Sequence, residues 1–270
     1  MIRAAVLGKP VHHSLSPLVH GLIYRELDIR CEYGLFEVDV SDAERLIRAS
    51  FSKPDEEWRG FSLTMPLKEV GFSLPFPIED RANEARSINT ITPKGSFNTD
   101  ISGFERVFRT EGLEPTEVVI LGNGATARSA LIAIDSLKSV SDVTLYRRSK
   151  FHDELLPHKR RVPLVVKSME EFGSEEMNAM TLVISTLPGS SQDSITEKLS
   201  GFEGTLIDVS YAPWPSLLAN VVPGRVISGL NLLVAQAVDQ ARIFSGLPFD
   251  EDEMYRKVLS STIASLGSSR

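Results

Sequence analysis

Short apolar runs alternate with helical patterns along most of the chain. In the first hundred residues, apolar or alternating runs predict strands at 2–7, 32–38, 58–63 and 88–92. A second series of predicted strands follows at 117–121, 142–146, 163–166, 181–185, 205–209 and 225–228. Amphipathic segments predict helices at 17–28, 41–50, 102–111, 125–138, 168–172, 214–220, 230–245 and 251–265. Strands that alternate with helices are typical of an α/β protein with parallel sheets.

The spacing of these elements changes near residues 98–104, NTDISGF. Before this segment, irregular polar loops separate the strands, and after it a regular strand–helix series begins. The last two predicted helices, within 230–265, come after that series and can pack back on the first half. We therefore predict an α/β fold with two domains. Residues 1–101 and 229–270 form an N-terminal α/β substrate domain, and residues 102–228 form a Rossmann-type dinucleotide-binding domain.

Composition narrows the range of functions. A net charge of −7 over 270 residues disfavours a nucleic-acid surface, which usually needs a basic face. No run of about 18 apolar residues is present, so no membrane helix is expected. The N-terminal MIRAAVLGKP has only a short apolar run, which indicates a first strand rather than a signal peptide. Cys31 is the only cysteine, so an internal disulfide is impossible, which fits a cytoplasmic location.

The stretch EVVILGNGATARSALIAI, residues 117–134, combines a strand, a glycine-rich turn and a helix. It fits the dinucleotide-binding pattern G-x-G-x-x-G/A in its required setting. Gly122 permits the tight turn, Gly124 lets a pyrophosphate approach the backbone, and Ala127 lets the helix pack closely. The alternative is a glycine-rich turn without a ligand. The predicted cofactor-binding residues of this turn are Gly122, Asn123, Gly124, Ala125, Thr126 and Ala127.

The loop after the next strand selects the cofactor in such domains. NAD enzymes usually place a carboxylate there, whereas this chain has Arg147, Arg148, Ser149 and Lys150. The alternative is a solvated basic loop. The functional interpretation is a site for a 2′-phosphate, and hence NADP as the cofactor.

Taken together, nine ordered motifs resemble the shikimate dehydrogenase family over nearly the whole chain. They are GKPVHHSLSPLVH (8–20), SLTMPLK (62–68), SINT (87–90), NTDISG (98–103), GNGATAR (122–128), YRRS (146–149), STLPG (185–189), IDVSYAPWPSLL (207–218) and SGLNLLVAQA (228–237). The resemblance implies an oxidoreductase of aromatic amino-acid biosynthesis that reversibly reduces 3-dehydroshikimate to shikimate with NADPH.

The resemblance also implies the site residues. Lys68 and Asp100 match the family's catalytic pair, in which a cation or proton donor acts at the carbonyl oxygen and a carboxylate orients it. Whether Lys68 transfers the proton or mainly holds charge stays open, and for an isolated lysine the alternative is a loop cap on the surface. The matching substrate-binding residues are Ser14, Ser16, Ser62, Thr64, Lys68, Asn89, Asp100, Tyr211 and Gln236. Further cofactor-binding positions are Thr186, Leu187, Val209 and Gly229.

Some of these residues have structural alternatives. Ser14 and Ser16 resemble a carboxylate-binding pair, but a serine before Pro17 is also a common helix start. Two positions depart from the family pattern. Ser62 stands where Asn is common, which puts substrate contacts at that corner in doubt. Ala125 replaces a second glycine, which is tolerable only if its φ stays below zero.

Parts of the pattern allow other functions. His12, His13 and His20 cluster in sequence, but no carboxylate or cysteine at ligand spacing accompanies them, so no metal site is expected. One alternative is a quinate/shikimate dehydrogenase paralogue, which often uses NAD. Another is a non-catalytic sensor that binds NADP and a metabolite without turnover. The expected partner is a small-molecule substrate, without nucleic acid or membrane, for a monomer or homodimer.

Overall fold

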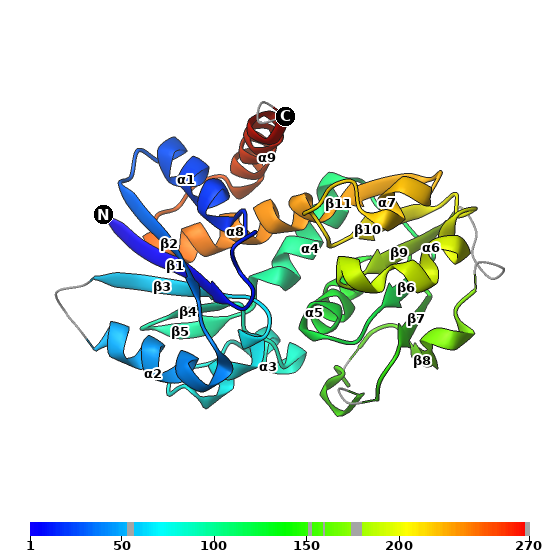
Figure 1. Cartoon of the computed structure of the whole chain (residues 1–270), viewed down its shortest axis with the longest axis horizontal. Helices are drawn as coiled ribbons and strands as arrows, with labels where there is room; N and C mark the ends of the chain where they lie inside the picture. The colour runs from blue at the N-terminus through cyan, green and yellow to red at the C-terminus, as the bar shows by residue number, and fades with distance from the viewer. Residues whose placement is uncertain (53–56, 151–152, 159, 174–179, 268–270) are drawn as a thin grey trace. The chain divides into compact units, whose positions relative to one another are not determined.

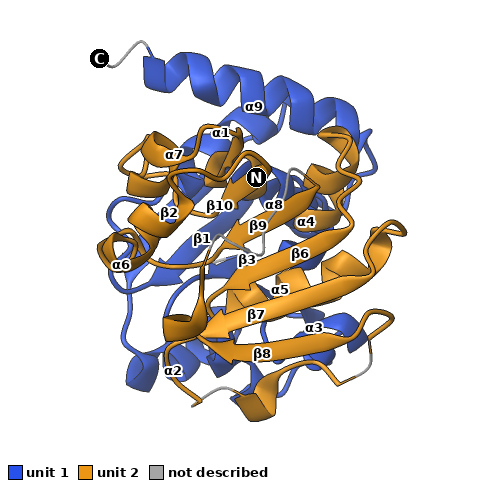
Figure 2. Cartoon of the chain, turned by 90° about the vertical axis from the view of Figure 1, so that its right-hand side faces the viewer, with its two compact units in different colours: residues 1–103, 233–270 blue, residues 104–232 orange. Residues whose placement is uncertain are grey.

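The structure is a computed structural model that describes residues 1–52, 57–150, 153–158, 160–173 and 180–267 (Figure 1). The chain divides into two compact units, which Figure 2 colours separately. Unit 1 comprises residues 1–103 and 233–270, and unit 2 comprises residues 104–232. The chain passes between them within α4 (Thr99–Thr110) and α8 (Gly229–Ser245). The sequence places these boundaries at 101/102 and 228/229.

Unit 1 is built on a five-stranded mixed sheet with the order β2-β1-β3-β4-β5. The first three strands in this order are parallel, and β4 pairs antiparallel with both β3 and β5. The strands are β1 (Ile2–Gly8), β2 (Cys31–Glu37), β3 (Trp58–Leu63), β4 (Thr90–Thr92) and β5 (Gly95–Phe97). Besides parts of α4 and α8, the helices are α1 (Ser16–Glu26), α2 (Val40–Phe51), the 3₁₀ helix Leu67–Ser73, α3 (Asp80–Ala85) and α9 (Glu251–Gly267).

The side chains of β3 alternate between the two faces of this sheet, as a strand requires. Phe61 and Leu63 pack in a core cluster that includes Ile47 of α2. Ser62 points to the opposite face, where its hydroxyl donates to Gln240 of α8. His20 of α1 contacts the same glutamine, so α1 and α8 cover the face opposite α2.

Unit 2 contains a parallel sheet with the order β11-β10-β9-β6-β7-β8. The strands are β6 (Glu117–Leu121), β7 (Asp142–Arg147), β8 (Leu164–Ser168), β9 (Thr181–Ser185), β10 (Thr205–Asp208) and β11 (Arg225–Ser228). The helices within it are α5 (Ala125–Ala133), α6 (Asp193–Leu199) and α7 (Leu217–Val221), with 3₁₀ turns at 134–136, 153–155, 169–171 and 189–191. Every residue of β9 is buried, which is typical of a strand covered on both faces.

The strand order of unit 2 reverses between β6 and β9. From β6 the chain runs outward through β7 to β8, and it then returns to β9 beside β6 and runs outward again to β11. Parallel α/β sheets bind ligands beyond the carboxyl ends of their strands at such a reversal. The loops after Leu121 and Ser185 lie at this point.

The predicted fold class is confirmed, and most predicted strands lie within two residues of the observed ones. Three elements were missed: β5, α3 and α6. β5 has only three residues, too few to show alternation, and α3 (DRANEA) contributes only small apolar side chains. The predicted helix 168–172 is a single 3₁₀ turn.

Several predicted helix boundaries were also wrong. α5 ends at Ala133 rather than at residue 138, because a 3₁₀ turn and the extended Leu137 follow it. α7 begins at Leu217 rather than at residue 214, since Pro215 precedes Ser216, whose hydroxyl caps the helix by accepting from the Ala219 amide. α4 begins at Thr99 rather than at residue 102, and this shift places Asp100 inside a helix.

Candidate active site

Lys68 and Asp100 meet in unit 1 just beyond the end of β3. The Nζ of Lys68 lies 2.5 Å from Oδ2 of Asp100, and the two side chains are 14% and 6% exposed. Leu67 anchors the 3₁₀ helix by its fully buried side chain, and the Lys68 carbonyl accepts from the Ile88 amide. Asp100 lies in the first turn of α4, where backbone amides favour a carboxylate. The pair is therefore a largely buried cation and anion held by two different elements.

Asn89 fixes the second oxygen of Asp100. Its Nδ2 donates to Asp100 Oδ1 at 2.9 Å and to Thr99 Oγ1 at 3.0 Å. Its Oδ1 accepts from the Thr99 amide and from the Thr90 hydroxyl, each at 2.8 Å. Both amide hydrogens are thus committed to protein acceptors. The sequence led us to expect free donor and acceptor groups for a substrate here, whereas the geometry makes Asn89 a support for Asp100.

Ser62 lies beside this site and is almost completely buried. Its hydroxyl donates to Gln240 Oε1 at 2.7 Å, so the contact of 2.6 Å with Tyr33 must use the tyrosine hydrogen. A hydroxyl has one hydrogen, and that of Ser62 points into the protein. Sequence analysis missed Gln240, although it follows Gln236 by one helical turn on the same face of α8.

Ser14 and Ser16 lie at the start of α1. The hydroxyl of Ser14 donates to that of Ser16 at 3.1 Å and accepts from the Ser16 amide at 3.2 Å. Ser16 is the first residue of the helix and its side chain accepts from no helix amide of the described chain. The geometry therefore pairs the two hydroxyls and gives no support to side-chain capping by Ser16.

The remaining predicted substrate residues are distributed over both units. In unit 1, Thr64 packs its methyl group over Gly8, where a Cβ would lie 2.3 Å from it. Gln236 of α8 is buried, and its Nε2 donates to the Leu233 carbonyl at 2.8 Å. Tyr211 belongs to unit 2, in the partly exposed segment between β10 and α7.

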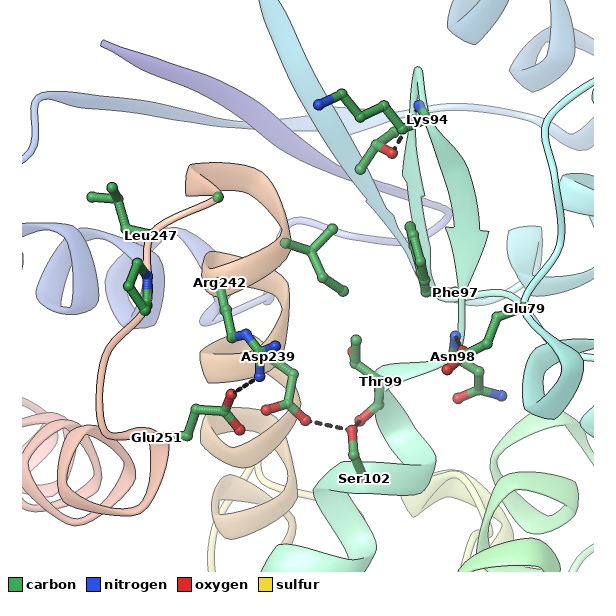
Figure 3. Close-up of a pocket in the computed structure, with 14 residues that line it drawn as sticks. Glu79, Lys94, Phe97, Asn98, Thr99, Ser102, Asp239, Arg242, Leu247 and Glu251 are labelled. Atoms are coloured by element: carbon green, nitrogen blue, oxygen red, sulfur yellow. Dashed lines mark hydrogen bonds and ion pairs between the residues drawn. The ribbon is translucent and has the colours of Figure 1, made fainter.

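A separate cavity in unit 1 is lined by neither Lys68 nor Asp100 (Figure 3). It has a volume of about 630 Å³ and lies among the β4–β5 hairpin, the first turn of α4 and the end of α8. Ser102 donates to Asp239 across it, and Arg242 pairs with Glu251 at its edge. The predicted site residues, all of which belong to the described ranges, are absent from its lining.

The glycine-rich turn of unit 2 has the geometry that its sequence predicts. Gly122 has a φ of +110°, and a Cβ there would lie 2.4 Å from Thr186 Oγ1, so the turn and the loop after β9 are in contact. A Cβ on Gly124 would point into open space, with no atom of the described residues beyond its own turn within 4 Å. Ala125 begins α5 in a helical conformation, so its methyl group causes no strain. The amide edge at Gly124 is therefore open to a phosphate group.

The loop that follows β7 lies next to this turn. Asn123 Nδ2 donates to the Ser149 carbonyl at 2.9 Å and ties the two segments together. Arg148 donates to the Ser191 carbonyl at 2.8 Å, whereas Arg147 pairs with Asp153 at 2.7 Å. The charge of Arg147 is thus already balanced by a carboxylate.

The other predicted cofactor positions surround the same strand ends. Thr186 donates to the Leu121 carbonyl at 2.9 Å, and Leu187 is buried in the core of unit 2. A Cβ on Gly229 would lie 2.0 Å from the Val209 carbonyl oxygen, so this glycine is required by close backbone packing.

Asp208, at the end of β10, is a polar group that sequence analysis missed. It is completely buried and accepts from Gln192 at 3.0 Å and from the Ser216 hydroxyl at 2.5 Å. Burial raises the pKa of its carboxyl, while these hydrogen bonds oppose the shift. Asp208 thereby fastens both ends of the segment that carries Tyr211.

The histidines and the helices bear on metal binding and on membranes. Within the described ranges, no group of three or more His, Cys, Asp or Glu side chains could hold a metal ion. His12 pairs with Glu37 at 2.9 Å on the surface, while His20 is fully buried against Gln240. In the same part of the chain, no helix is long and apolar enough to cross a membrane.

Comparisons with known proteins agree with this architecture. A family model described as the shikimate dehydrogenase substrate binding domain matches residues 6–91. The protein named shikimate dehydrogenase (NADP(+)) of Leptospira interrogans is 28% identical over 92% of this chain and 90% of its own length. The protein of the same name from Methanococcoides burtonii is 27% identical over 90% of this chain and 91% of its own length. The pentafunctional AROM polypeptide of Candida tropicalis is 27% identical over 94% of this chain, which spans 18% of that polypeptide.

Solved structures show the same fold. The crystal structure of Mycobacterium tuberculosis shikimate dehydrogenase has a TM-score of 0.83 at 29% identity, covering 97% of this chain and 100% of that one. The structure from Mycobacterium fortuitum has a TM-score of 0.74 at 28% identity, covering 95% of this chain and 97% of that one. With the ordered motifs, the matched substrate domain and these full-length likenesses, the chain belongs to the shikimate dehydrogenase family.

Proposed function

We propose that this protein catalyses the reversible, NADP-dependent reduction of 3-dehydroshikimate to shikimate in aromatic amino-acid biosynthesis. The observation that carries the proposal is the buried Lys68–Asp100 pair beyond the end of β3. Two relatives of nearly equal length bear the name shikimate dehydrogenase (NADP(+)). The substrate is therefore a small molecule, and we place the enzyme in the cytoplasm.

The roles of the two units follow from their contents. We assign substrate binding to unit 1, because it contains Lys68, Asp100 and the paired serines. We assign the cofactor to unit 2, because its glycine-rich turn and basic loop lie at the strand reversal of a parallel sheet. Tyr211 is the substrate residue that unit 2 would contribute.

The chain's own residues supply charge and orientation. A bound NADPH provides the hydride for the ketone carbon. Lys68 stabilises the negative charge that develops on the ketone oxygen and supplies a hydrogen to it, while Asp100 holds the ammonium group in place. The hydroxyls of Ser14 and Ser16, paired at 3.1 Å, are suited to a carboxylate of the substrate.

NADP fits the residues around the cofactor turn. The open backbone at Gly124 can accept a pyrophosphate, and Arg148 and Ser149 follow β7 where a 2′-phosphate would lie. Arg148 is already oriented by the Ser191 carbonyl. A planar guanidinium can bind phosphate through two parallel hydrogen bonds.

The decisive experiment uses the purified full chain with shikimate and NADP⁺ and follows the absorbance of the reduced cofactor. Quinate and NAD⁺ are tested in parallel. We expect efficient turnover with shikimate and NADP⁺ only. Comparable rates with quinate would favour the quinate/shikimate paralogue. Measurable binding of NADP⁺ and shikimate without turnover would favour the non-catalytic sensor and overturn the proposal.

A further inference from the structure

A continuous hydrogen-bonded chain connects the Lys68–Asp100 pair to the interior of unit 1. Beyond Asn89, the Thr90 hydroxyl donates to Asn89 Oδ1 and accepts from Gln240 Nε2 at 3.0 Å. Gln240 Oε1 in turn accepts from Ser62 at 2.7 Å. Thr90 and Gln240 are 0% and 2% exposed, so water cannot replace these contacts without rearrangement.

The orientation of each amide in this chain is determined by partners of fixed polarity. Gln240 Nε2 also donates to the Asn89 carbonyl at 3.2 Å, and a carbonyl can only accept. Asn89 Oδ1 accepts from the Thr99 amide, which can only donate. Gln240 and Asn89 therefore cannot flip without placing two donors or two acceptors in contact.

We propose that Gln240 is a positioning residue for the Lys68–Asp100 pair, acting through Thr90 and Asn89. Gln240 touches neither member of the pair. It holds the Thr90 hydroxyl so that its hydrogen points to Asn89, and Asn89 then presents its amide to Asp100. This inference rests on the proposed function, because it assigns a role in the same reaction.

Other groups around Gln240 support a positioning role rather than a role in proton transfer. The contact of 3.2 Å between His20 Nε2 and Gln240 Oε1 requires the hydrogen on Nε2, since the amide oxygen can only accept. His20 Nδ1 is buried without a hydrogen-bond partner among the described residues, and its ring stacks on Tyr33 at 3.9 Å. The environment of Gln240 is therefore neutral and closely packed.

The test compares Thr90→Val with Thr90→Ser. Valine keeps the shape of threonine and removes the hydroxyl, whereas serine keeps the hydroxyl. We expect Thr90→Val to lower kcat for shikimate oxidation about tenfold to a hundredfold, as a small displacement of catalytic groups can do. The KM should change less than about threefold, since no direct substrate contact is removed. Thr90→Ser should restore most of kcat.

Gln240→Met is the second variant, because methionine is nearly isosteric and cannot make the two amide contacts. It should lower kcat like Thr90→Val, and the double variant should be no worse than the poorer single one, since both interrupt one chain. The control is Thr262→Val in α9, which removes an equally buried hydroxyl that donates to the Val258 carbonyl of its own helix. It should leave kcat unchanged.

A second readout separates this inference from the proposed function. The side-chain amide hydrogens of Asn89, followed by NMR, should exchange with solvent at least about tenfold faster in Thr90→Val and Gln240→Met than in the wild type, if the buried network loosens. Faster exchange with no shikimate turnover in the wild type would support the network and refute the function. Folded Thr90→Val protein with a kcat within about twofold of wild type, or a loss shared equally by Thr90→Ser, would overturn the positioning role.

Discussion

Lys68 Nζ lies 2.5 Å from Asp100 Oδ2, although the two residues come from a 3₁₀ helix and an α-helix that are separated by the β4–β5 hairpin. Two elements must therefore keep their places for this contact to persist. The lysine is anchored by the burial of Leu67 and the aspartate by its hydrogen bond from Asn89.

Removing the ammonium group should affect turnover more than binding. We expect Lys68→Ala to lower kcat by roughly 10²–10⁴, the usual range for acid–base groups, with a much smaller change in the KM for shikimate. Asp100→Asn should also be damaging, and the two losses should not add. Steady-state kinetics measure both. Lys257→Ala, which removes a lysine paired with Glu26 on the surface, is the matched control. A Lys68→Ala enzyme that keeps most of its kcat would refute the assignment.

Replacing Ser14 and Ser16 by alanine should weaken substrate binding specifically. Each lost hydrogen bond to a charged group is worth about 1.5–3 kcal/mol, so the KM for shikimate should rise by at least tenfold. The Kd for NADP⁺, measured by fluorescence titration, should stay nearly constant. Thermal stability should also change little, because the Ser16 side chain does not cap its helix. A lower melting temperature with unaltered shikimate affinity would make these serines structural.

The choice of cofactor should depend on Arg148 more than on Arg147. Two charge-assisted contacts to a 2′-phosphate should favour NADP⁺ over NAD⁺ by at least about a hundredfold in kcat/KM. Arg148→Ala should remove most of this preference and spare activity with NAD⁺. Arg147→Ala should have a smaller effect, because Asp153 already balances that charge. Equal use of both cofactors by the wild type would contradict the prediction.

The two turn glycines should respond differently to a methyl group. Gly122→Ala forces alanine into a φ of +110° against Thr186, so we expect a loss of about 1–3 kcal/mol in unfolding free energy. Gly124→Ala places its methyl group in open space, and stability should change by less than about 0.5 kcal/mol. The Kd for NADP⁺ should nevertheless rise about tenfold or more, because a phosphate can no longer approach the backbone. Denaturant unfolding and cofactor titration separate the two effects, and unchanged NADP⁺ affinity in Gly124→Ala would count against this turn as the phosphate site.

Stability should fall in acid because of His20. Burial lowers its pKa from 6.5 to about 3. Between these values the unfolded chain binds more protons than the folded one, so the unfolding free energy decreases as pH falls below 6.5. At 1.36 kcal/mol per pH unit, this group contributes a loss of about 2 kcal/mol between about pH 6.5 and about pH 5. His20→Phe keeps a ring against Tyr33 and should show a shallower pH dependence in urea unfolding, whereas the exposed His13→Gln should retain the wild-type slope.

Local patterns were sufficient for much of the fold and for the cofactor turn. A strand, a tight turn and a helix are specified within the few residues of EVVILGNGATAR, and the φ of Gly122 agrees with the role assigned to it. The positions of the short strand β5 and the helix α3 were not accessible in the same way. Their side chains are too few or too small for a period to be detected.

Contacts between distant parts of the chain could not be predicted. Ser62 and Gln240 are 178 residues apart, and nothing in SLTMPLK indicates that the serine hydroxyl is occupied. The same applies to Asn89, whose amide looked free for a substrate, and to Arg147, whose partner Asp153 lies beyond its own loop. In each case the sequence identified a functional group, and the fold determined what that group can still bind.

The hydrogen-bonded chain behind Asp100 has an electrical consequence. Tyr33, Ser62, Thr90 and Asn89 each donate toward the next member, and Gln240 accepts on one side and donates on the other. Their dipoles therefore point the same way, with the positive ends toward the carboxylate. In a buried, weakly polarisable setting such dipoles reinforce one another. Asp100 thus sits in a fixed favourable field that is supplied without any net charge, and it keeps its negative charge opposite Lys68 while drawing on neutral side chains alone.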